Sequence, residues 1–330
     1  MQIHEITSLI DKRNAKRILL LCHHNADPDA VCSAFAFSQL IKQIRPKLDI
    51  EIAAAQGPSR LSKFMLKSLP MTLTNQPNIE EAEVIVLLDT NTVQQLDEWG
   101  ERVKASEALI IVIDHHASHP ETERLANLTV ANETASSTCE IIYRLFKEAE
   151  VKLTPIEAKA LFLGIAFDTR HFILAGSATL KILVDLTEAG VKTEETLSLL
   201  SLPMAPSERI ARLKAGKRMK LSRINNWLIA SSRVSAFQAS AARALVALGA
   251  HVAIVAGQHD ERVQISMRAS REFYDKTCVH LGRDVAKPLG EYLHGLGGGH
   301  AVSAGANGIG DSEASLKRCL RLLKEKLTQA

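Results

Sequence analysis

The chain has 330 residues, of which 46% are hydrophobic and 23% are charged, and its formal net charge is +3. This composition is typical of a globular protein, and the length exceeds what one hydrophobic core usually holds, so we expect two domains. The apolar runs fall far short of the roughly 20 residues that a membrane-spanning helix needs, and residues 1–11 show no secretory signal. We therefore expect a soluble, cytoplasmic protein without a membrane partner.

Cysteines and a basic segment bear on the class of protein. The five cysteines are widely spaced and form no C-x-x-C pair, which argues against a disulfide framework and a thiolate zinc site. We interpret most of them as small core residues.

Seven cations lie between Arg209 and Arg223 with no acidic residue among them. Two interpretations stay open for this segment: a solvated helix face, or a rim that attracts anions.

The first half of the chain alternates short apolar runs with amphipathic segments, which is the pattern of a parallel α/β sheet. The expected strands are residues 17–22, 50–54, 84–88 and 109–113. Capping boxes at 137–140 and 154–157 predict the starts of two helices. The second of these helices is expected to run through Phe162 to a loop that starts near Asp168.

The second half predicts a separate, smaller domain. A polar stretch with two prolines at 191–208 predicts a linker between a first domain at 1–190 and a second at 209–330. The second domain has strand-like runs at 227–231, 252–256 and 263–267, a glycine-rich stretch at 295–310, and a closing helix with leucines at 316, 320, 323 and 327. The expected fold is a parallel-sheet α/β domain plus a smaller α/β domain, with the active site in the cleft between them.

Acidic residues and histidines follow three of the expected strands directly. They are His23, Asp27 and Asp29 after the first strand, Asp89 after the third, and Asp114, His115 and His116 after the fourth. Residues just beyond the carboxyl ends of parallel strands can converge in space. Carboxylates with an added histidine favour Mn²⁺ or a similar metal over Mg²⁺ or Ca²⁺. Asp27 and Asp29 can serve two adjacent cations that Asp89 bridges.

Each of these residues also has a purely structural interpretation. Asp27 and Asp29 could cap the helix that begins near Ala30, Asp89 could lie in a turn, and the histidine pair could be buried and hydrogen bonded. Without a cation, however, carboxylates and imidazoles gathered at three strand ends would repel and desolvate one another, which favours a metal site. Other histidines lack such neighbours and are interpreted as structural or surface residues: His4, His119, His171, His251, His259, His280 and His294.

Two motifs resemble those of one family. Asp114-His115-His116, with His23-x-x-x-Asp27-x-Asp29 and Asp89 upstream, resembles the signature of the DHH phosphoesterase superfamily, and residues 297–305 resemble the motif of the DHH-associated C-terminal domain. The resemblance covers nearly the whole chain. It implies two divalent cations, most readily Mn²⁺. One would be held by His23, Asp27 and Asp89, and the other by Asp29, Asp89, His115 and Asp168.

The resemblance also implies roles for residues that do not bind metal. Asp114 would orient His115, and His116 would face the substrate phosphate. A substrate anchor in the second domain would consist of Gly297, Gly298, Gly299, His300, Ser266 and Arg268. Glycines let backbone N–H groups approach an anion, and arginine holds phosphate with two parallel hydrogen bonds. By itself, a glycine run is more often a flexible turn. The expected catalytic residues are His116, Asp114, Arg268 and His300.

The compact layout resembles the branch of nano-RNases and phosphatases of 3′-phosphoadenosine 5′-phosphate (pAp). We therefore expect metal-dependent hydrolysis of short single-stranded oligonucleotides or pAp. Alternatives are a phosphodiesterase of cyclic or linear dinucleotides and, from another class, a non-catalytic nucleotide sensor, which the complete ligand set disfavours. A homodimer is left open. Ala26 and Cys32 depart from the family pattern, as do Arg170 and His171, which would narrow or recharge the pocket.

Three further activities are disfavoured. The second domain lacks the Ser-Arg-Lys-Lys segment of the family's inorganic pyrophosphatases. A RecJ-type processive exonuclease would need further nucleic-acid-binding domains that this length does not accommodate. A dinucleotide-dependent oxidoreductase would need a G-x-G-x-x-G turn after the first strand, where this sequence is acidic.

Overall fold

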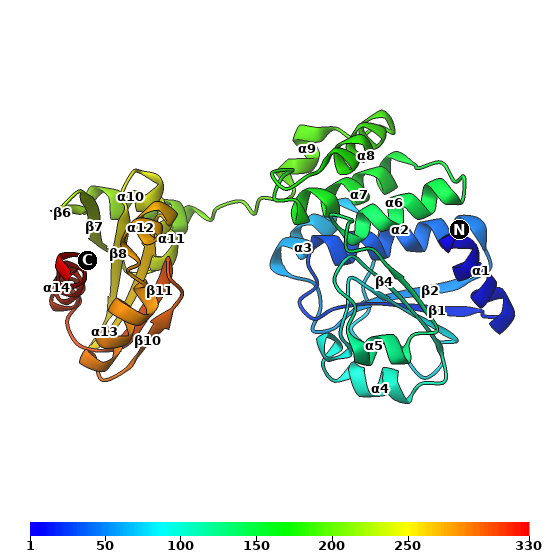
Figure 1. The fold of residues 1–330 in the computed structure, drawn as a ribbon, viewed down its shortest axis with the longest axis horizontal. Coiled ribbons are helices and arrows are strands. Elements are labelled where there is room, and N and C mark those ends of the chain that lie inside the picture. The colour runs from blue at the N-terminus through cyan, green and yellow to red at the C-terminus, as the bar shows by residue number, and fades with distance from the viewer. Residues whose placement is uncertain (330) are drawn as a thin grey trace. The chain divides into compact units, whose positions relative to one another are not determined.

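The protein is described by a computed structural model that covers residues 1–329 (Figure 1). The chain divides into two compact units, Met1–Leu202 and the residues from Pro203 onward. The boundary lies inside the expected linker, but much of that segment is helical, because α9 spans Thr193–Ser198 and α10 spans Pro206–Lys217. No helix in the described part of the chain is long and apolar enough to cross a membrane.

The first unit contains a five-stranded parallel sheet in the order β2-β1-β3-β4-β5. The strands are β1 (Arg17–Cys22), β2 (Asp49–Ala54), β3 (Val84–Leu88), β4 (Leu109–Asp114) and β5 (Leu128–Ala131). All five residues of the central strand β3 are buried, as expected for a parallel strand covered on both faces. The sequence did not predict β5, a short edge strand in which only Val130 is buried.

Helices cover both faces of this sheet (Figure 1). On one face, α1 (Gln2–Arg13), α2 (Pro28–Ile44), α6 (Thr138–Glu148) and α7 (Pro155–Asp168) share a core with Ile18 and Leu20 of β1. On the other face, α4 (Trp99–Ala105) and the 3₁₀ turn Val93–Leu96 share a core with Leu19 and Leu21. Neighbouring residues of β1 thus point to opposite faces, as the two-residue period of a strand requires. The remaining helices of this unit are α3 (Arg60–Met65), the 3₁₀ turn Leu66–Ser68, α5 (Pro120–Leu125) and α8 (Ser177–Glu188).

Side-chain caps start three helices near the expected ligands. Asp27 caps α2, Ser137 caps α6 through a 3.1 Å bond from the Glu140 N–H, and a capping box of Thr154 and Glu157 starts α7. As the sequence predicted, α7 gives way to a loop near Asp168. The helix continues through Asp168, which is its last residue, so the helix itself positions this carboxylate.

The second unit contains a six-stranded sheet in the order β10-β11-β9-β8-β7-β6, antiparallel except for the pair β7 and β8. One core contains side chains of α12, the π-helical segment Leu281–Ala286, α13 and α14, and the other contains those of α10 and α11. Leu316, Leu323 and Leu327 of α14 are buried as predicted, and Leu320 is partly buried. The strands are β6 (Lys220–Ile224), β7 (Trp227–Arg233), β8 (Val252–His259), β9 (Arg262–Ala269), β10 (Leu296–Gly299) and β11 (Ser303–Ile309), and the other helices are α11 (Gln238–Ala247), α12 (Arg271–Thr277), α13 (Lys287–Tyr292) and α14 (Ser312–Gln329).

Two segments of this unit differ from the simplest interpretation of the sequence. The cationic residues 209–223 do not share one helix face, because α10 ends at Lys217 and β6 begins at Lys220. The glycine run 297–299 is not a flexible turn but most of edge strand β10, paired with β11. A side chain on Gly297 would overlap the carbonyl of Ala286, so this strand requires glycine for close packing against the helical segment behind it.

Candidate metal centre

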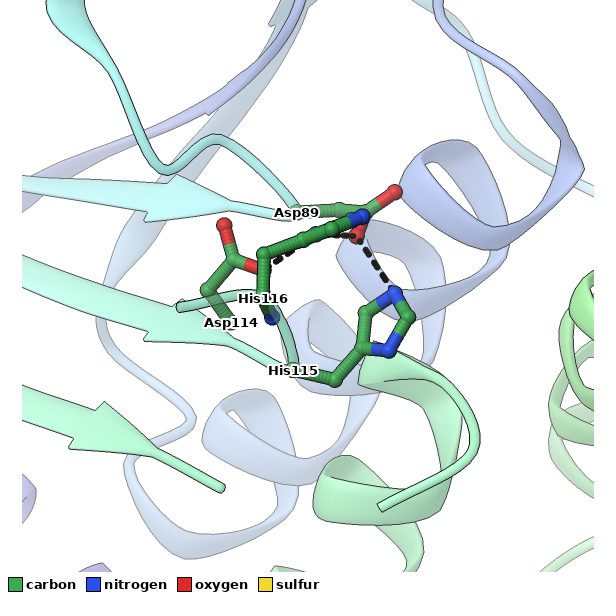
Figure 2. Close-up of side chains that lie close together, drawn as sticks. All are labelled: Asp89, Asp114, His115 and His116. Atoms are coloured by element: carbon green, nitrogen blue, oxygen red, sulfur yellow. Dashed lines mark hydrogen bonds and ion pairs between the residues drawn. The ribbon is translucent and has the colours of Figure 1, made fainter. Parts of the chain in front are cut away.

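The carboxyl ends of β1, β3 and β4 bring the expected ligands together at one edge of the first sheet. Figure 2 shows the side chains of Asp89, His115 and His116 pointing toward one another. Three sets of donor atoms each lie within 4.8 Å of one another: Asp89, Asp114, His115 and His116; His23, Asp27 and Asp89; and Asp29, His115 and Asp168. Six of these residues are the ligands that the sequence resemblance implies.

Asp89 lies at the centre of the cluster. It follows β3 with a φ of 53°, a left-handed conformation that is uncommon for residues other than glycine, asparagine and aspartate. Its Oδ2 lies 3.8 Å from Nε2 of His23, and its Oδ1 lies 3.6 Å from Nε2 of His115. Burial, together with the charges of Asp27, Asp114 and Asp168, raises the pKa of Asp89 to about 7. One buried carboxylate therefore faces histidines from two different strand ends.

His23 and Asp27 lie on one side of Asp89. The Nδ1 of His23 is 2.8 Å from the His24 carbonyl oxygen, an arrangement in which Nδ1 carries the proton and the lone pair of Nε2 is free for a cation. Asp27 accepts the backbone N–H groups of Asp29 and Ala30 through Oδ1. Burial raises the pKa of Asp27, but the interaction with His23, whose Nε2 lies 3.9 Å away, and the bonds from these N–H groups outweigh it, so the net shift is downward. Asp27 is thus both a helix cap and a member of the cluster.

Asp29 of α2 lies on the other side of Asp89, and its fully buried side chain contacts the first turn of α6. Its two oxygens accept the backbone N–H groups of Thr138 at 2.6 Å and Cys139 at 3.0 Å. These are N–H groups of the first helical turn, which have no partner within the helix and favour negative charge. Burial and the charges of Asp89, Asp168 and Asp27 nevertheless raise the pKa of Asp29 well above its usual range.

His115 and Asp168 complete the group around Asp29. The Nε2 of His115 lies 3.1 Å from Oδ2 of Asp168, yet this buried nitrogen forms no hydrogen bond with any residue of the described chain. Asp168 comes within reach because α7 passes very close to α2 and α6. A Cβ on Gly164, one helical turn before Asp168, would overlap the sulfur of Cys139 and lie 2.6 Å from Oδ1 of Asp29. The approach of α7 therefore requires glycine at this position.

Asp114 orients His116, whereas the resemblance implied that it would orient His115. Oδ1 of Asp114 accepts the backbone N–H of His116 at 2.8 Å and lies 2.7 Å from its Nδ1 (Figure 2). The bond to Asp114 raises the pKa of His116 to about 9 despite partial burial. The hydrogen bond from the His116 backbone N–H to Asp114 fixes the turn after β4 and holds the His116 ring beside Asp114. His116, whose side chain is half exposed, is therefore a cation at neutral pH on the open side of the cluster.

The cluster fits divalent cations. The six expected ligands contribute four carboxylates and two imidazoles, and two of these carboxylates are buried with raised pKa values. Such a set is unfavourable without positive charge at its centre, because buried ionised carboxylates repel one another. The buried Nε2 of His115 also forms no hydrogen bond among residues 1–329. Mixed nitrogen and oxygen donors suit Mn²⁺ or a similar cation.

The expected anchor residues all lie in the second unit. The Arg268 guanidinium donates to the Met267 carbonyl at 3.1 Å and to the Ser303 hydroxyl. Burial and nearby Arg243 lower the pKa of Arg268, so two cations lie close together there. Ser266 is two residues before Arg268 on the same strand, and the Gly299–His300 segment is held by a 2.7 Å bond from the His300 N–H to the Ser303 carbonyl. A Cβ on Gly298 would meet open space.

Sequence reasoning missed Thr138, whose hydroxyl donates to Oδ1 of Asp89 at 2.9 Å. The capping box at 137–140 was the available signal, because it places Thr138 in a first helical turn, where free N–H groups attract carboxylates. Several histidines outside the cluster have structural roles, as expected. His119, His251 and His280 each accept a backbone N–H through Nδ1.

Comparison with known proteins connects this site to a family. Residues 17–165 match the DHH family, N-terminal domain; this range contains every expected ligand except Asp168. The chain is 32% identical over 313 residues to an uncharacterized protein of Methanocaldococcus jannaschii, covering 95% of this chain and 93% of that protein.

Two further comparisons concern more distant proteins. The chain is 33% identical over 202 residues to a probable manganese-dependent inorganic pyrophosphatase of Streptococcus equi subsp. zooepidemicus, covering 54% of this chain and 58% of the pyrophosphatase. The fold is similar to that of an exopolyphosphatase-related protein from Bacteroides fragilis, with a TM-score of 0.63, 19% identity, and coverage of 99% of this chain and 97% of the other.

Proposed function

The chain belongs to the DHH family, and from this premise we propose that it is a manganese-dependent phosphoesterase. The observation that carries the proposal is the position of Asp89, which faces His23 through one oxygen and His115 through the other. A carboxylate in this position can bridge two cations. The streptococcal relative, named as manganese-dependent, supports the choice of metal.

The expected ligands form two sets that share Asp89. His23, Asp27 and Asp89 would hold one cation, and Asp29, Asp89, His115 and Asp168 would hold the other. When bound, two such cations lower the pKa of water and neutralise negative charge that develops on phosphorus. The N–H groups of Thr138 and Cys139 hold Asp29 with both oxygens engaged, so its position is fixed before a cation binds.

His116 supplies a positive charge that can bind the substrate phosphate. Asp114 keeps it protonated at neutral pH, and its half-exposed ring can bind a phosphate oxygen. The same proton can pass from the ring to the leaving oxygen, because a positioned imidazole serves as a general acid. Arg268 and His300 would anchor a second phosphate or the base of the substrate.

For the substrate, we propose short oligonucleotides or pAp. The neighbouring cations Arg268 and Arg243 can bind an anion, which supports a substrate that carries a second phosphate besides the scissile one. Pyrophosphate is a second candidate, favoured by the 33% identity to the streptococcal protein over 202 residues. The glycine strand β10, in place of the lysine-containing segment expected in pyrophosphatases, argues for the nucleotide substrates.

A hydrolysis panel with Mn²⁺ tests the proposal. The substrates are pAp, dinucleotides, longer oligonucleotides, cyclic dinucleotides and pyrophosphate, and the Asp89→Asn variant serves as the inactive control. We expect the fastest turnover on pAp or the shortest oligonucleotides, and none in Asp89→Asn. Turnover of pyrophosphate alone would reassign the substrate. Tight nucleotide binding without turnover of any substrate would favour a sensor, and full activity in chelated protein would contradict the metal centre.

A further inference from the structure

The second unit has a pocket on the face of its sheet opposite to Arg268. Its walls are β6, β7 and the first turns of α14, and its volume is about 530 Å³. Ile229 of β7 and Val252 of β8 face the core under α14, whereas Ala253, which pairs with Arg268, faces the other core. The lining residues Ser231 and Arg233 follow Ile229 at two-residue spacing, so they lie on the α14 side. The pocket is therefore separate from the expected substrate anchor.

The pocket has an apolar wall and a cationic rim. Leu316 and Leu320 of α14 supply the apolar wall, and Ser222 and Ser231 add hydroxyl groups. The rim consists of Arg218, Lys220, Arg233 and Lys317. Three of these positive side chains come from β6, β7 and α14, and Arg218 lies in the turn before β6.

Acidic residues do not balance these cations. Glu313 is the one carboxylate among the lining residues, and it is shared loosely between Arg233 at 3.7 Å and Lys317 at 3.5 Å. Lys220 forms no ion pair within residues 1–329. Elsewhere on the molecule, cations such as Arg102 form close two-bond pairs with a carboxylate. Like charges gathered in a concave site repel one another and focus a positive potential, which an anion relieves.

We propose that this pocket binds a nucleoside phosphate. The phosphate would contact the ammonium and guanidinium groups of the rim, and the base or ribose would lie against Leu316 and Leu320. A volume of about 530 Å³ is within the usual range of roughly 300–1,000 Å³ for small-molecule pockets, which combine apolar walls with a few polar groups. The site goes beyond the proposed reaction, because it includes neither the metal ligands nor Arg268 and its neighbours.

The contacts favour a small ligand over a polynucleotide. Only two of the seven cations at residues 209–223, Arg218 and Lys220, line the pocket. Of the others, Arg212 pairs with Glu208, and Arg223 donates to the Asn225 carbonyl. The four cations of the rim therefore converge on one cavity, whereas the other five cations of residues 209–223 lie outside its lining.

Calorimetry tests the proposal by measuring how tightly ADP and inorganic phosphate bind to the Arg268→Ala protein in the presence of chelator. This background removes the proposed substrate anchor, and chelation removes the need for activity, so the result is independent of the proposed reaction. We expect ADP to bind more tightly than phosphate. Lys220→Glu and Lys317→Glu, on opposite walls, should each weaken ADP binding about tenfold or more, because attraction is replaced by repulsion.

Arg223→Glu is the matched control, because it makes the same charge change on β6 outside the pocket. It should leave ADP binding nearly unchanged, and thermal unfolding should show that all three variants are folded. If ADP does not bind, or if Arg223→Glu weakens binding as much as Lys220→Glu, the pocket is not a specific site. If phosphate binds as tightly as ADP, the assignment to a nucleoside phosphate is wrong. If one lysine variant fails to fold, the other still decides the outcome.

Discussion

Thr138 donates its hydroxyl proton to Oδ1 of Asp89 over 2.9 Å, and both residues are buried. The bond links the first turn of α6 to the residue that follows β3. Because the Thr138 backbone N–H also donates to Asp29, one residue contacts both buried carboxylates of the metal centre. The orientation of these ligands thus depends on where α6 begins.

Thr138→Val should weaken metal binding without removing a ligand. Valine keeps the shape and the backbone bond to Asp29 but loses the bond to Asp89, and loss of such a supporting contact commonly costs about 10–100-fold in metal affinity or activity. Titration with Mn²⁺ measures the effect. Thr134→Val is the control, because its hydroxyl bonds to Asn132. Equal affinities in both variants would show that Asp89 needs no support.

Asp89→Asn should be the most damaging change of a single ligand, because both sets of ligands include this residue. Asparagine tolerates the left-handed backbone at this position, so the variant tests the charge and not the fold. Elemental analysis should show less metal alongside lost turnover. Asp97→Asn, at a residue that also has a positive φ, should retain both. Full metal content in Asp89→Asn would mean that Asp89 is only a turn residue.

The stability of the metal-free protein should fall as pH rises through neutrality. The pKa of Asp89 is about 7 in the folded protein and about 3.9 in an unfolded chain, so the folded state binds this proton more tightly. The stabilisation is complete below about pH 4 and is lost as pH rises through about 7. Thermal unfolding with chelator measures the fall. The increase in Tm caused by Mn²⁺ should grow over the same pH window, and a Tm shift independent of pH would contradict this coupling.

Asp114→Asn should lower the pKa of His116 from about 9 toward the ordinary value of about 6.5. At neutral pH the ring would then lose its charge, and the alkaline limb of the kcat/KM profile should move to lower pH. Proton NMR of the His116 ring gives the pKa directly. Asp260→Asn, beside exposed His259, should leave both measurements unchanged. An unshifted profile in Asp114→Asn would remove His116 from the reaction.

Arg268→Ala should weaken substrate binding and leave metal content unchanged. A charge-assisted hydrogen bond contributes roughly 1.5–3 kcal/mol, so kcat/KM should fall on the order of 10- to 150-fold. The loss should appear on pAp and be small on a minimal chromogenic phosphodiester that cannot reach the anchor. Arg262→Ala, at the start of the same strand, is the control. Equal losses on both substrates would show that the second unit shapes the metal centre.

The parts of the fold that the sequence predicted are those in which local pattern and burial agree. The runs at 18–22 and 84–88 are continuously apolar because both faces of the parallel sheet are covered, and histidine or aspartate follows each run directly. The order of the strands was not needed to bring His23, Asp89 and His115 together, because parallel strands place all their carboxyl ends at one edge.

The parts that could not be predicted depend on tertiary contacts. Residues 220–224 form a strand because they pair with β7, although a solvated helix face was one of the two interpretations of the cationic segment. Gly297 lies in a strand because a helical segment packs against it, and no local signal distinguishes this from a turn. The pairing of Asp114 with His116 depends on the turn after β4, and not on spacing in the sequence.

Gly164 has a consequence for how such an enzyme can diversify. Arg268 lies in the second unit and every expected metal ligand in the first, so substitutions around Arg268 leave the ligand set itself unchanged. A single methyl group at Gly164 would instead displace α7 and, one turn later, the carboxylate of Asp168. A buried substitution that replaces no ligand would then have the phenotype of a lost metal ligand. In a mutational scan, Gly164 should therefore group with the aspartates and histidines of the centre and not with the packing residues around it.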